Sequence, residues 1–385
     1  MGERIAPPWL DAAAPRAVTA ALAGGGWRAY YVGGCVRDAL LGRRAADIDV
    51  ATDALPEAVI AAAQAAGIRA VPTGIEHGTV TLVHGGAPVE VTTFRRDVET
   101  DGRRAVVAFT GDMAEDARRR DFTMNALYAT SAGEVLDPLG GLPDLRARRL
   151  RFVGEPAARI AEDALRILRF FRFHAWYGDP QAGLDAEALA ACAEAAEAVD
   201  GLSRERVGAE MAKLLAAPDP APSVAAMASC GVLGRVLPGA EATALGPVVH
   251  GEALAGLGPD WRRRLAALGG QADWPARLRL SRGDARAFEA IRAALEADEP
   301  LAASAYRHGA EAARDAAVIR AAALGAPPPG DLAAETARGA AARFPLRAAD
   351  LALEGPALGA ALKRLEAAWV ASDFTLDREA LVALA

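Results

Sequence analysis

Two aspartates that follow a glycine pair are the residues of this sequence best suited to chemistry. Residues 30–53, YYVGGCVRDALLGRRAADIDVATD, carry Gly-Gly at 33–34 and the triplet Asp-Ile-Asp at 47–49. Because residues i and i+2 of a strand face the same way, the carboxylates of Asp47 and Asp49 would project together. They would repel each other unless a cation lay between them, and hard oxygen ligands suit Mg²⁺. The pair is therefore a candidate catalytic metal site.

The glycine pair precedes a segment that suits a phosphate group. Glycine lets the backbone turn sharply and approach a ligand closely. A helix starting near Cys35 would point its free N–H groups at an anion such as a triphosphate. The guanidinium of Arg37, in the first helical turn, could hold phosphate oxygens. We therefore expect Gly34 and Arg37 to bind a nucleotide, whereas each motif alone is also compatible with an ordinary turn or a helix cap.

Two strands and the short helix between them would position these residues. Ala29-Tyr30-Tyr31-Val32 is β-branched and aromatic, which is typical of a buried strand. Ile48 and Val50 alternate with the two aspartates and would point into the core. This alternation favours a strand over a surface turn for the aspartate pair.

A second constellation lies in residues 158–176, ARIAEDALRILRFFRFHAW, which the spacing predicts to form one helix. Its apolar stripe follows the i, i+3, i+4, i+7 pattern of a buried face, and consists of Ala164, Ile167, Leu168 and Phe171. The opposite half of the helix carries Asp163, Arg166, Arg169 and Arg172. Phe170 and Phe173 interleave with these arginines, which is unusual unless something stacks there or another domain packs on them. A solvated basic face is the alternative.

An aspartate and an arginine on that helix could read the pairing edge of a base. Cytosine and adenine present an exocyclic amine beside a bare ring nitrogen, and uracil and guanine present the reverse order. A carboxylate only accepts hydrogen bonds and a guanidinium only donates them. Asp163 and Arg166 would therefore take C and A and reject U and G.

Three further features are candidates with open interpretations. Glu90, in an alternating strand, is either a third carboxylate or the partner of Arg37, Arg95 or Arg96 in an ion pair. His77, a lone histidine before a strand, is expected to be structural. The polar segment 97–110 contains Asp101-Gly102, a turn signal.

Composition bounds the class of protein. The 385 residues are 52% hydrophobic, which is enough for substantial cores and more than one unit. We find no apolar signal core and no membrane span, so no membrane partner is expected. The three cysteines, Cys35, Cys192 and Cys230, have no metal spacing and fit a reducing cytoplasm. The net charge of −7 argues mildly against nonspecific nucleic-acid binding, but arginines cluster between residues 95 and 172, and an arginine-lined cleft would suit RNA phosphates.

The expected fold class is α+β, with a mixed sheet and helices followed by an all-α remainder. The expected division is a helical lead (1–26), a catalytic head (27–150), a helical neck with the base-reading helix (151–217) and a helical body and tail (218–385). A proline break at 217–222 marks the last boundary.

Four motifs in chain order carry a resemblance to a known family. They are GGCVRDALLG (33–42) with Asp47-x-Asp49, RRDFTMNAL (119–127), DPLGGLPDL (137–145) and EDALRILR (162–169). Together they resemble the class II tRNA nucleotidyltransferase and poly(A) polymerase family, most closely its bacterial CCA-adding branch. The resemblance covers about residues 27–175 and fades in the helical remainder.

The resemblance implies addition of C, C and A to the tRNA 3′ end from CTP and ATP, with Mg²⁺ at Asp47 and Asp49. It implies that Asp163 and Arg166 select the base, and that Arg120, Arg169 and Arg172 bind the nucleotide. It also implies that residues 97–110 form the mobile loop of enzymes that add all three nucleotides, and that residues 218–385 hold the tRNA. It implies no protein partner. No His-Asp dipeptide occurs, so the phosphohydrolase domain of one branch is not expected.

Three alternatives stay open. A poly(A) polymerase or an A-only adding enzyme of the same family would also accept the base selection of Asp163 and Arg166. A catalytically idle RNA-binding protein is the alternative outside the enzymes, although the intact Asp47 and Asp49 argue against it. A small-molecule nucleotidyltransferase would not need the long helical half.

Overall fold

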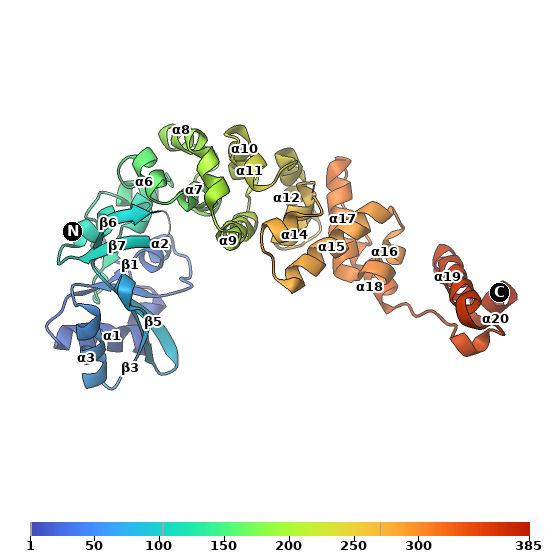
Figure 1. The fold of residues 1–385 in the computed structure, drawn as a ribbon, viewed down its shortest axis with the longest axis horizontal. Helices are drawn as coiled ribbons and strands as arrows, with labels where there is room; N and C mark the ends of the chain where they lie inside the picture. The colour runs from blue at the N-terminus through green and yellow to red at the C-terminus, as the bar shows by residue number, and fades with distance from the viewer. Residues whose placement is uncertain (1, 102–103, 270) are drawn as a thin grey trace. The chain divides into compact units, whose positions relative to one another are not determined.

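The chain forms two compact units, which are described separately (Figure 1). The structure is a computed structural model that describes residues 2–101, 104–269 and 271–385, with the backbone alone at 97–101 and 104–106. Unit 1 is Met1–Leu202 with Ser229–Arg235, and unit 2 is Ser203–Ala228 with Val236–Ala385. The expected division into lead, head, neck and body stays a prediction; the boundary between Leu202 and Ser203 lies inside the segment expected to form the neck.

Unit 1 is built on a mixed sheet with the strand order β3-β4-β5-β2-β1-β8-β9. The strands are β1 (Ala29–Val32), β2 (Asp49–Thr52), β3 (Arg69–Gly74), β4 (Thr79–His84), β5 (Ala87–Thr93), β8 (Tyr128–Ala129) and β9 (Val135–Leu136). Strand β2 runs antiparallel to β1 and parallel to β5. This mixed sheet, with the helices that follow it, confirms the expected α+β class.

The central strands are buried because their side chains are β-branched or aromatic. Tyr31, Val50 and Val91 are each at most 1% exposed. Helices α1 (Ala13–Gly24) and α3 (Pro56–Ala65) pack beside each other against β4 and β5 (Figure 1). Strand β2 begins only at Asp49, so Asp47 and Ile48 precede it. Val50 lies in the core as expected, whereas Ile48 is only half-buried.

The polar segment expected to be a loop contains two strands. Strands β6 (Arg95–Asp101) and β7 (Arg104–Phe109) pair antiparallel as a separate two-stranded sheet. Of the predicted Asp101-Gly102 turn, Gly102 lies outside the described residues.

The remaining helices of unit 1 include short turns that connect the sheet to the helical region. They are η1 (Pro8–Asp11), α2 (Gly34–Leu40), η2 (Ile75–His77), α4 (Met113–Arg118), η3 (Thr123–Asn125), α5 (Leu142–Arg146), α6 (Pro156–Glu162), α7 (Leu165–Tyr177), α8 (Ala186–Glu194) and η4 (Ala196–Gly201).

The prediction of a single helix over 158–176 is wrong, because the helix is interrupted at Asp163 and forms α6 and α7 instead. This residue ends α6 with extended backbone angles, φ −152° and ψ 104°. Its Oδ1 accepts a hydrogen bond from the N–H of Leu165 at 3.1 Å, in the first turn of α7. Aspartate competes with the helix for such local hydrogen bonds, a preference that the apolar periodicity conceals.

Of the two explanations for aromatic residues among the arginines, a stacking ligand or packing by another part of the protein, the structure shows packing. Phe170 is 0% and Phe173 5% exposed. They pack with Phe122 and Phe152, with ring centroids 5.1 Å apart for Phe122–Phe173 and 5.7 Å for Phe152–Phe170. The chain between the head and α6 therefore covers this face of α7 and joins it to the sheet.

Unit 2 is helical in its described residues. Its helices, with two that cross the division between the units, are α9 (Arg204–Leu215), α10 (Ala221–Ser229), α11 (Val232–Val236), η5 (Ala242–Ala244), α12 (Leu245–Leu254), α13 (Trp261–Ala267), α14 (Trp274–Arg277), α15 (Arg282–Ala297), α16 (Leu301–His308), α17 (Ala310–Ala323), α18 (Leu332–Ala341), η6 (Ala348–Asp350), α19 (Gly355–Ala371) and α20 (Arg378–Ala383).

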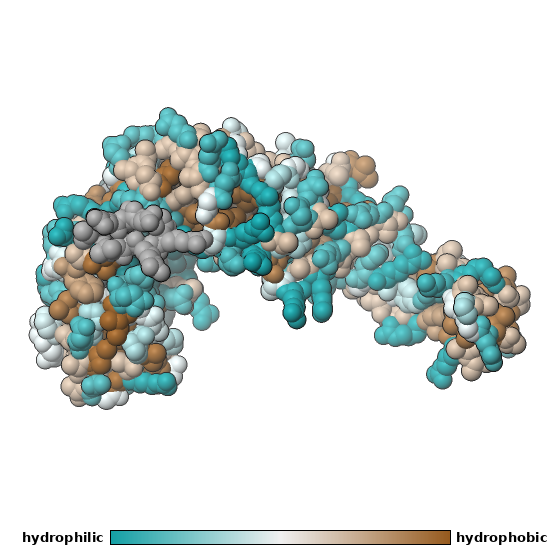
Figure 2. Space-filling model, viewed as in Figure 1, coloured by the Kyte–Doolittle hydropathy of each residue, from teal (hydrophilic) through white to brown (hydrophobic). Residues whose placement is uncertain are grey.

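Two buried arginines join the helices at the centre of unit 2. Arg263 and Arg264 are 2% and 1% exposed, and both bond to the buried carboxylate of Glu252. Arg264 also donates to the carbonyl of Leu215 at 2.7 Å, which ties α13 to the end of α9. On the face in Figure 2, hydrophilic side chains cover much of the surface between α9 and α18. Within the described ranges, no helix has both the length and the apolarity needed to cross a bilayer.

Candidate active site

Carboxylates from the parallel strands β2 and β5, in the middle of the sheet of unit 1, come together where β2 begins. Asp49, the first residue of β2, lies directly opposite Glu90 of β5 in the register of the two strands. Asp49 is half-buried, and Glu90 is exposed. Residues paired in register on adjacent strands project to the same side, so these two carboxylates are neighbours.

The environment of Asp49 is that of a carboxylate that benefits from a cation. Its pKa is raised to about 6 by burial first, then by the charge of Glu90 and also by that of Asp47, while Arg120 opposes the shift. Asp47 is exposed and precedes the strand. Three carboxylates therefore repel one another here, and a divalent cation would relieve the repulsion.

This donor set fits a hard divalent cation such as Mg²⁺. All the donors are carboxylate oxygens, which Mg²⁺ prefers, usually with waters and substrate phosphates completing its octahedron. Among the residues that the structure describes, no three acidic, histidine or cysteine side chains already form a complete ligand cluster.

The glycine turn brings the backbone against an arginine. Gly33 has φ +72°, a conformation that side-chain-bearing residues rarely adopt, and a Cβ there would lie 3.3 Å from Nη1 of Arg120. Gly34 begins α2. Because the charge of Arg120 also reaches Asp49, one guanidinium borders both the turn and the carboxylates. The expected nucleotide role of Gly34 and Arg120 stays a prediction that this proximity supports.

A buried aspartate that the sequence did not single out holds Arg120 in place. Asp116 of α4 is 1% exposed, and its Oδ2 accepts hydrogen bonds from Nη2 of Arg120 at 3.0 Å and from the hydroxyl of Tyr128 at 2.7 Å. Its Oδ1 accepts from Nε of Arg119 at 2.8 Å. Burial alone would raise the pKa of Asp116, but the charges of Arg120 and Arg119 lower it to about 2. The i+3 and i+4 spacing to the two arginines was the signal available in the sequence.

Arg37, expected to hold phosphate, is engaged inside the protein. It is 6% exposed, and its Nη1 donates to Oδ1 of Asn125 at 2.6 Å while its Nε donates to Asp38 at 2.9 Å. Its Nη2 donates to the hydroxyl of Tyr177 at 2.7 Å, and its Cζ lies 3.9 Å from the centroid of that ring. A phosphate contact stays a prediction, and the contacts present assign Arg37 a positioning role.

The two residues expected to read the base lie at the break between α6 and α7. Arg166 is in the first turn of α7, and Asp163 precedes that turn and accepts a hydrogen bond at its carbonyl from the N–H of Arg166 at 3.0 Å. The guanidinium of Arg166 donates to Oε2 of Glu162 at 2.5 Å and to the carbonyl of Arg159 at 2.7 Å. Contact of Arg166 with a base would therefore require it to exchange one of these partners. The structure brings the pair together, and its function stays a prediction.

Arg169 and Arg172, also expected to bind nucleotide, differ in their surroundings. Arg169 donates from Nε to Oδ2 of Asp121 at 2.8 Å, and burial of Asp121 is outweighed by the charge of Arg169, so the pKa of Asp121 falls to about 2. The Cζ of Arg172 lies 4.3 Å from the ring centroid of Phe173. Both roles stay predictions, and Arg169 has an evident structural one.

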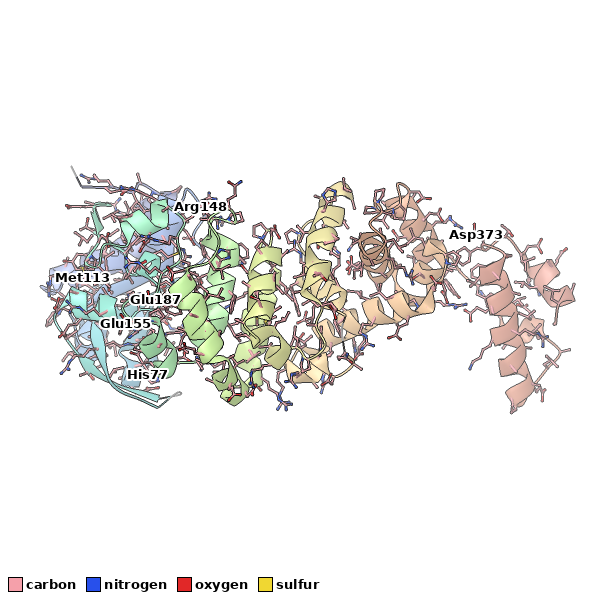
Figure 3. The ribbon with its side chains drawn as sticks, turned by 90° about the horizontal axis from the view of Figure 1, so that it is seen from above. His77, Met113, Arg148, Glu155, Glu187 and Asp373 are labelled. Atoms are coloured by element: carbon pink, nitrogen blue, oxygen red, sulfur yellow. The ribbon has the colours of Figure 1, made fainter. Side chains whose placement is uncertain are left out.

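His77, labelled in Figure 3, ends the turn η2, and its expected structural role stays a prediction. Its carbonyl accepts a hydrogen bond from Nη1 of Arg95, at the start of β6. This main-chain contact ties β6 to the edge of the main sheet.

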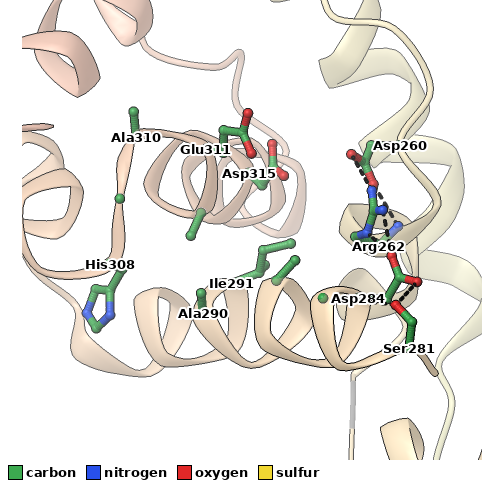
Figure 4. A pocket seen from close by; sticks show the side chains of 14 residues that line it. Asp260, Arg262, Ser281, Asp284, Ala290, Ile291, His308, Ala310, Glu311 and Asp315 are labelled. Carbon is green, nitrogen blue, oxygen red and sulfur yellow. Dashed lines mark hydrogen bonds and ion pairs between the residues drawn. The ribbon is translucent and has the colours of Figure 1, made fainter. Parts of the chain in front are cut away.

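A separate pocket in unit 2 has a volume of about 600 Å³ (Figure 4). Arg262 spans one end, where its Nε donates to Asp284 at 2.7 Å, and Ser281 donates to the same carboxylate at 2.6 Å. Glu311 and Asp315 lie across the pocket. It holds none of the expected site residues.

A glycine turn beside carboxylates from parallel strands, on a mixed sheet followed by helices, is the arrangement of a nucleotidyltransferase head. The family model described as "Poly A polymerase head domain" matches residues 29–151, and that described as "Probable RNA and SrmB- binding site of polymerase A" matches residues 183–243.

Comparison with individual proteins gives a more specific relation. The chain is 43% identical over 216 residues to the CCA-adding enzyme of Geobacillus thermodenitrificans, covering 56% of this chain and 52% of that one. It is 44% identical over 184 residues to the mitochondrial CCA tRNA nucleotidyltransferase 1 of Danio rerio, covering 48% and 43%. The chain thus spans about half the length of the curated relatives it matches.

Solved structures match over nearly the whole chain. The Bacillus stearothermophilus CCA-adding enzyme in complex with CTP matches with a TM-score of 0.76 and 30% identity, over 99% of this chain and 97% of that one. The Thermotoga maritima CCA-adding enzyme complexed with tRNA-CCA has the same fold, with a TM-score of 0.68 and 19% identity over 98% and 95%. The chain belongs to the family of CCA-adding enzymes, which shares its head domain with poly(A) polymerases.

Proposed function

We propose that this protein adds C, C and A in turn to the 3′ end of tRNA, using CTP and ATP and releasing pyrophosphate. The observation that carries the proposal is the pairing of Asp49 with Glu90 beside the turn at Gly33, with Arg120 against both. This arrangement supports the proposal because the carboxylates could hold a cation and Arg120 could bind phosphate oxygens of the same nucleotide.

The reaction would be attack of the tRNA 3′-hydroxyl on the α-phosphate of the nucleotide. Mg²⁺ held by Asp47 and Asp49, with Glu90 as the candidate third carboxylate, would supply Lewis-acid chemistry that favours loss of the hydroxyl proton and offsets charge on the leaving group. Arg120, fixed by Asp116, would bind triphosphate oxygens where negative charge accumulates. Gly33 and Gly34 would let the backbone N–H groups approach the same phosphates.

Base selection would take place in the first turn of α7. Asp163 would accept a hydrogen bond from the exocyclic amine of C or A, and Arg166 would donate to the adjacent ring nitrogen. Uracil and guanine would place an acceptor against Asp163 and a donor against Arg166, which is costly in a desolvated site. Arg169 and Arg172 would then hold the nucleotide beside this turn.

We further propose that residues 218–385 hold the tRNA and that the protein acts in the cytoplasm, where tRNA, ATP and CTP occur together. Its three cysteines are free thiols, as a reducing compartment allows.

Three tRNA primers test the proposed activity. They end before the first C, after one C and after two, and each is incubated with Mg²⁺ and one nucleotide at a time. The proposal expects C on the first two primers and A on the third. Addition of A alone to every primer would assign the protein to the poly(A) polymerases, and A on the third primer alone would make it an A-only adding enzyme. No addition to any primer would leave RNA binding as its function.

A further inference from the structure

Buried polar contacts join helix α2 to helix α7. Helix α2 follows the glycine turn, and α7 carries Arg166 and directly follows Asp163, the two proposed base-selecting residues. Nη1 of Arg37 donates to Oδ1 of Asn125 at 2.6 Å, and Nδ2 of Asn125 donates to Oδ1 of Asp121 at 3.0 Å. Nε of Arg169, on α7, donates to Oδ2 of the same aspartate at 2.8 Å. Asn125 is 7% and Asp121 9% exposed, so water does not readily replace these bonds.

A second connection joins the same two helices at the other end of α7. Tyr177 is the last residue of α7, and its hydroxyl accepts from Nη2 of Arg37 at 2.7 Å. Its ring lies between two guanidinium groups, with Cζ of Arg37 3.9 Å and Cζ of Arg43 5.1 Å from the centroid. Arg43 also donates to the carbonyl of Trp176 at 2.9 Å.

We propose that Tyr177 is a positioning residue for nucleotide selection, which with Asn125 fixes the tilt of α7 relative to the glycine turn. The inference rests on the proposed function of Asp163 and Arg166, and it adds a residue that lies outside all four motifs. The middle of α7 is held by the bond of Arg169 to Asp121 and by the packing of Phe170 and Phe173. The bond at Tyr177 attaches the last residue of α7 to α2, which limits tilting of the helix about that middle.

The lengths of the two arms give the size of the effect. At a rise of 1.5 Å per residue, Tyr177 lies about 12 Å along the axis from Arg169, and Leu165, the first residue of α7, lies about 6 Å away in the other direction. A shift of about 1 Å at Tyr177 would therefore move Leu165, whose N–H donates to Asp163, by roughly 0.5 Å if the helix tilts about Arg169. Hydrogen-bonding groups of a site must be held within about 0.5 Å, so this displacement reaches the limit at which base discrimination weakens.

The variant Tyr177→Phe tests this role with little change in packing. It keeps the ring, which also packs on Phe173 with centroids 5.5 Å apart, and removes only the hydroxyl bonded to Arg37. The matched control is Tyr306→Phe in unit 2, which removes a hydroxyl bonded to the carboxylate of Glu366. Because Tyr306 lies in the region proposed to hold the tRNA, the control is read only as the ratio for CTP over UTP on one tRNA, in which any change of tRNA affinity cancels. Asn125→Ala breaks the other connection and is a second variant.

The measurement is kcat/KM for CTP and for UTP on tRNA that lacks its 3′ CCA. We expect Tyr177→Phe to reduce the preference for CTP over UTP about tenfold or more, since misplacement by about 1 Å can cost a hundredfold. Asn125→Ala should reduce the preference in the same direction, and Tyr306→Phe should leave it unchanged. An unchanged preference in Tyr177→Phe, or an equal loss in the control, would overturn the inference.

Hydrogen–deuterium exchange separates this inference from the proposed function. Tyr177→Phe should speed amide exchange in the first turn of α7 whether or not the protein adds nucleotides, and Tyr306→Phe should not. If the wild type adds no C or A to tRNA but this exchange changes as expected, the proposed function fails and the mechanical link stands. If exchange in that turn is unchanged, the link itself is refuted.

Discussion

Replacing Asp121 by asparagine should remove a defined part of the stability of unit 1. Asp121 accepts hydrogen bonds from Asn125, from Arg169 and from the N–H of Phe122, and it is 9% exposed. Although burial raises its pKa, the charge of Arg169 and these hydrogen bonds lower it from 3.8 to about 2. This lowering of the pKa on folding corresponds to roughly 2 kcal/mol of stability at pH 7. The variant Asp121→Asn should lose this contribution, because an amide resembles the protonated acid.

The pH dependence of this loss has a definite sign. Because the pKa of Asp121 is lower in the folded protein, its contribution is complete above the unfolded pKa of about 4 and disappears as the pH falls towards 2. The difference in stability between wild type and Asp121→Asn should therefore be largest at pH 7 and fall to about half by pH 3. Other carboxylates titrate in both proteins, so they cancel in the difference.

Native-state hydrogen exchange of the slowest amides in α7 gives this free energy for unit 1 alone, once intrinsic exchange rates are corrected for pH. The control is Asp200→Asn, which breaks the bond to Arg235 in the same unit; the side chain of Asp200 is 55% exposed. Such a surface pair should contribute less than about 1 kcal/mol. Equal losses in the two variants, or a loss in Asp121→Asn that does not shrink at low pH, would refute the reasoning.

Three further outcomes are expected. Asp47→Ala combined with Asp49→Ala should abolish nucleotide incorporation in Mg²⁺ while tRNA binding in a filter assay stays close to wild type; retained turnover would remove these residues from the metal site. Asp163→Ala should let UTP and GTP compete about fivefold or more better with CTP and ATP, since one lost base-edge hydrogen bond costs about 1–3 kcal/mol; unchanged selectivity in competition assays would exclude it from base selection. Shortening the segment 97–110 should slow addition of A to tRNA ending in CC more than addition of C to tRNA lacking CCA, and equal slowing of both would deny the segment a switching role.

The sequence was sufficient to predict the two strands beside the site because its signals there are local. The strand at 29–32 forms as expected, whereas the expected strand through Asp47 and Ile48 begins only at Asp49, so the alternation located the strand but not its first residue. The parallel pairing that sets Glu90 opposite Asp49 is a long-range contact, which no local pattern determines. The sequence therefore left open whether Glu90 is a third carboxylate of the site or the partner of an arginine. The register of β2 and β5, which sets Glu90 opposite Asp49, favours the first role.

The helix over 158–176 shows where local patterns mislead. Its apolar spacing continues through Asp163, but a side-chain hydrogen bond breaks the helix there. The pattern left open whether a ligand or another part of the protein covers Phe170 and Phe173, and the contacts with Phe122 and Phe152 are long-range. The bond of Arg37 to Tyr177 is also long-range, and no motif beside the glycine pair indicated it.

The central claim is best tested by sequencing the 3′ ends of a tRNA that lacks CCA after incubation of the purified protein with Mg²⁺, CTP and ATP. The account predicts ordered addition of C, C and A, with no further extension, and loss of all addition in the combined Asp47→Ala and Asp49→Ala variant. A run of A without C, or addition that survives in this variant, would contradict it.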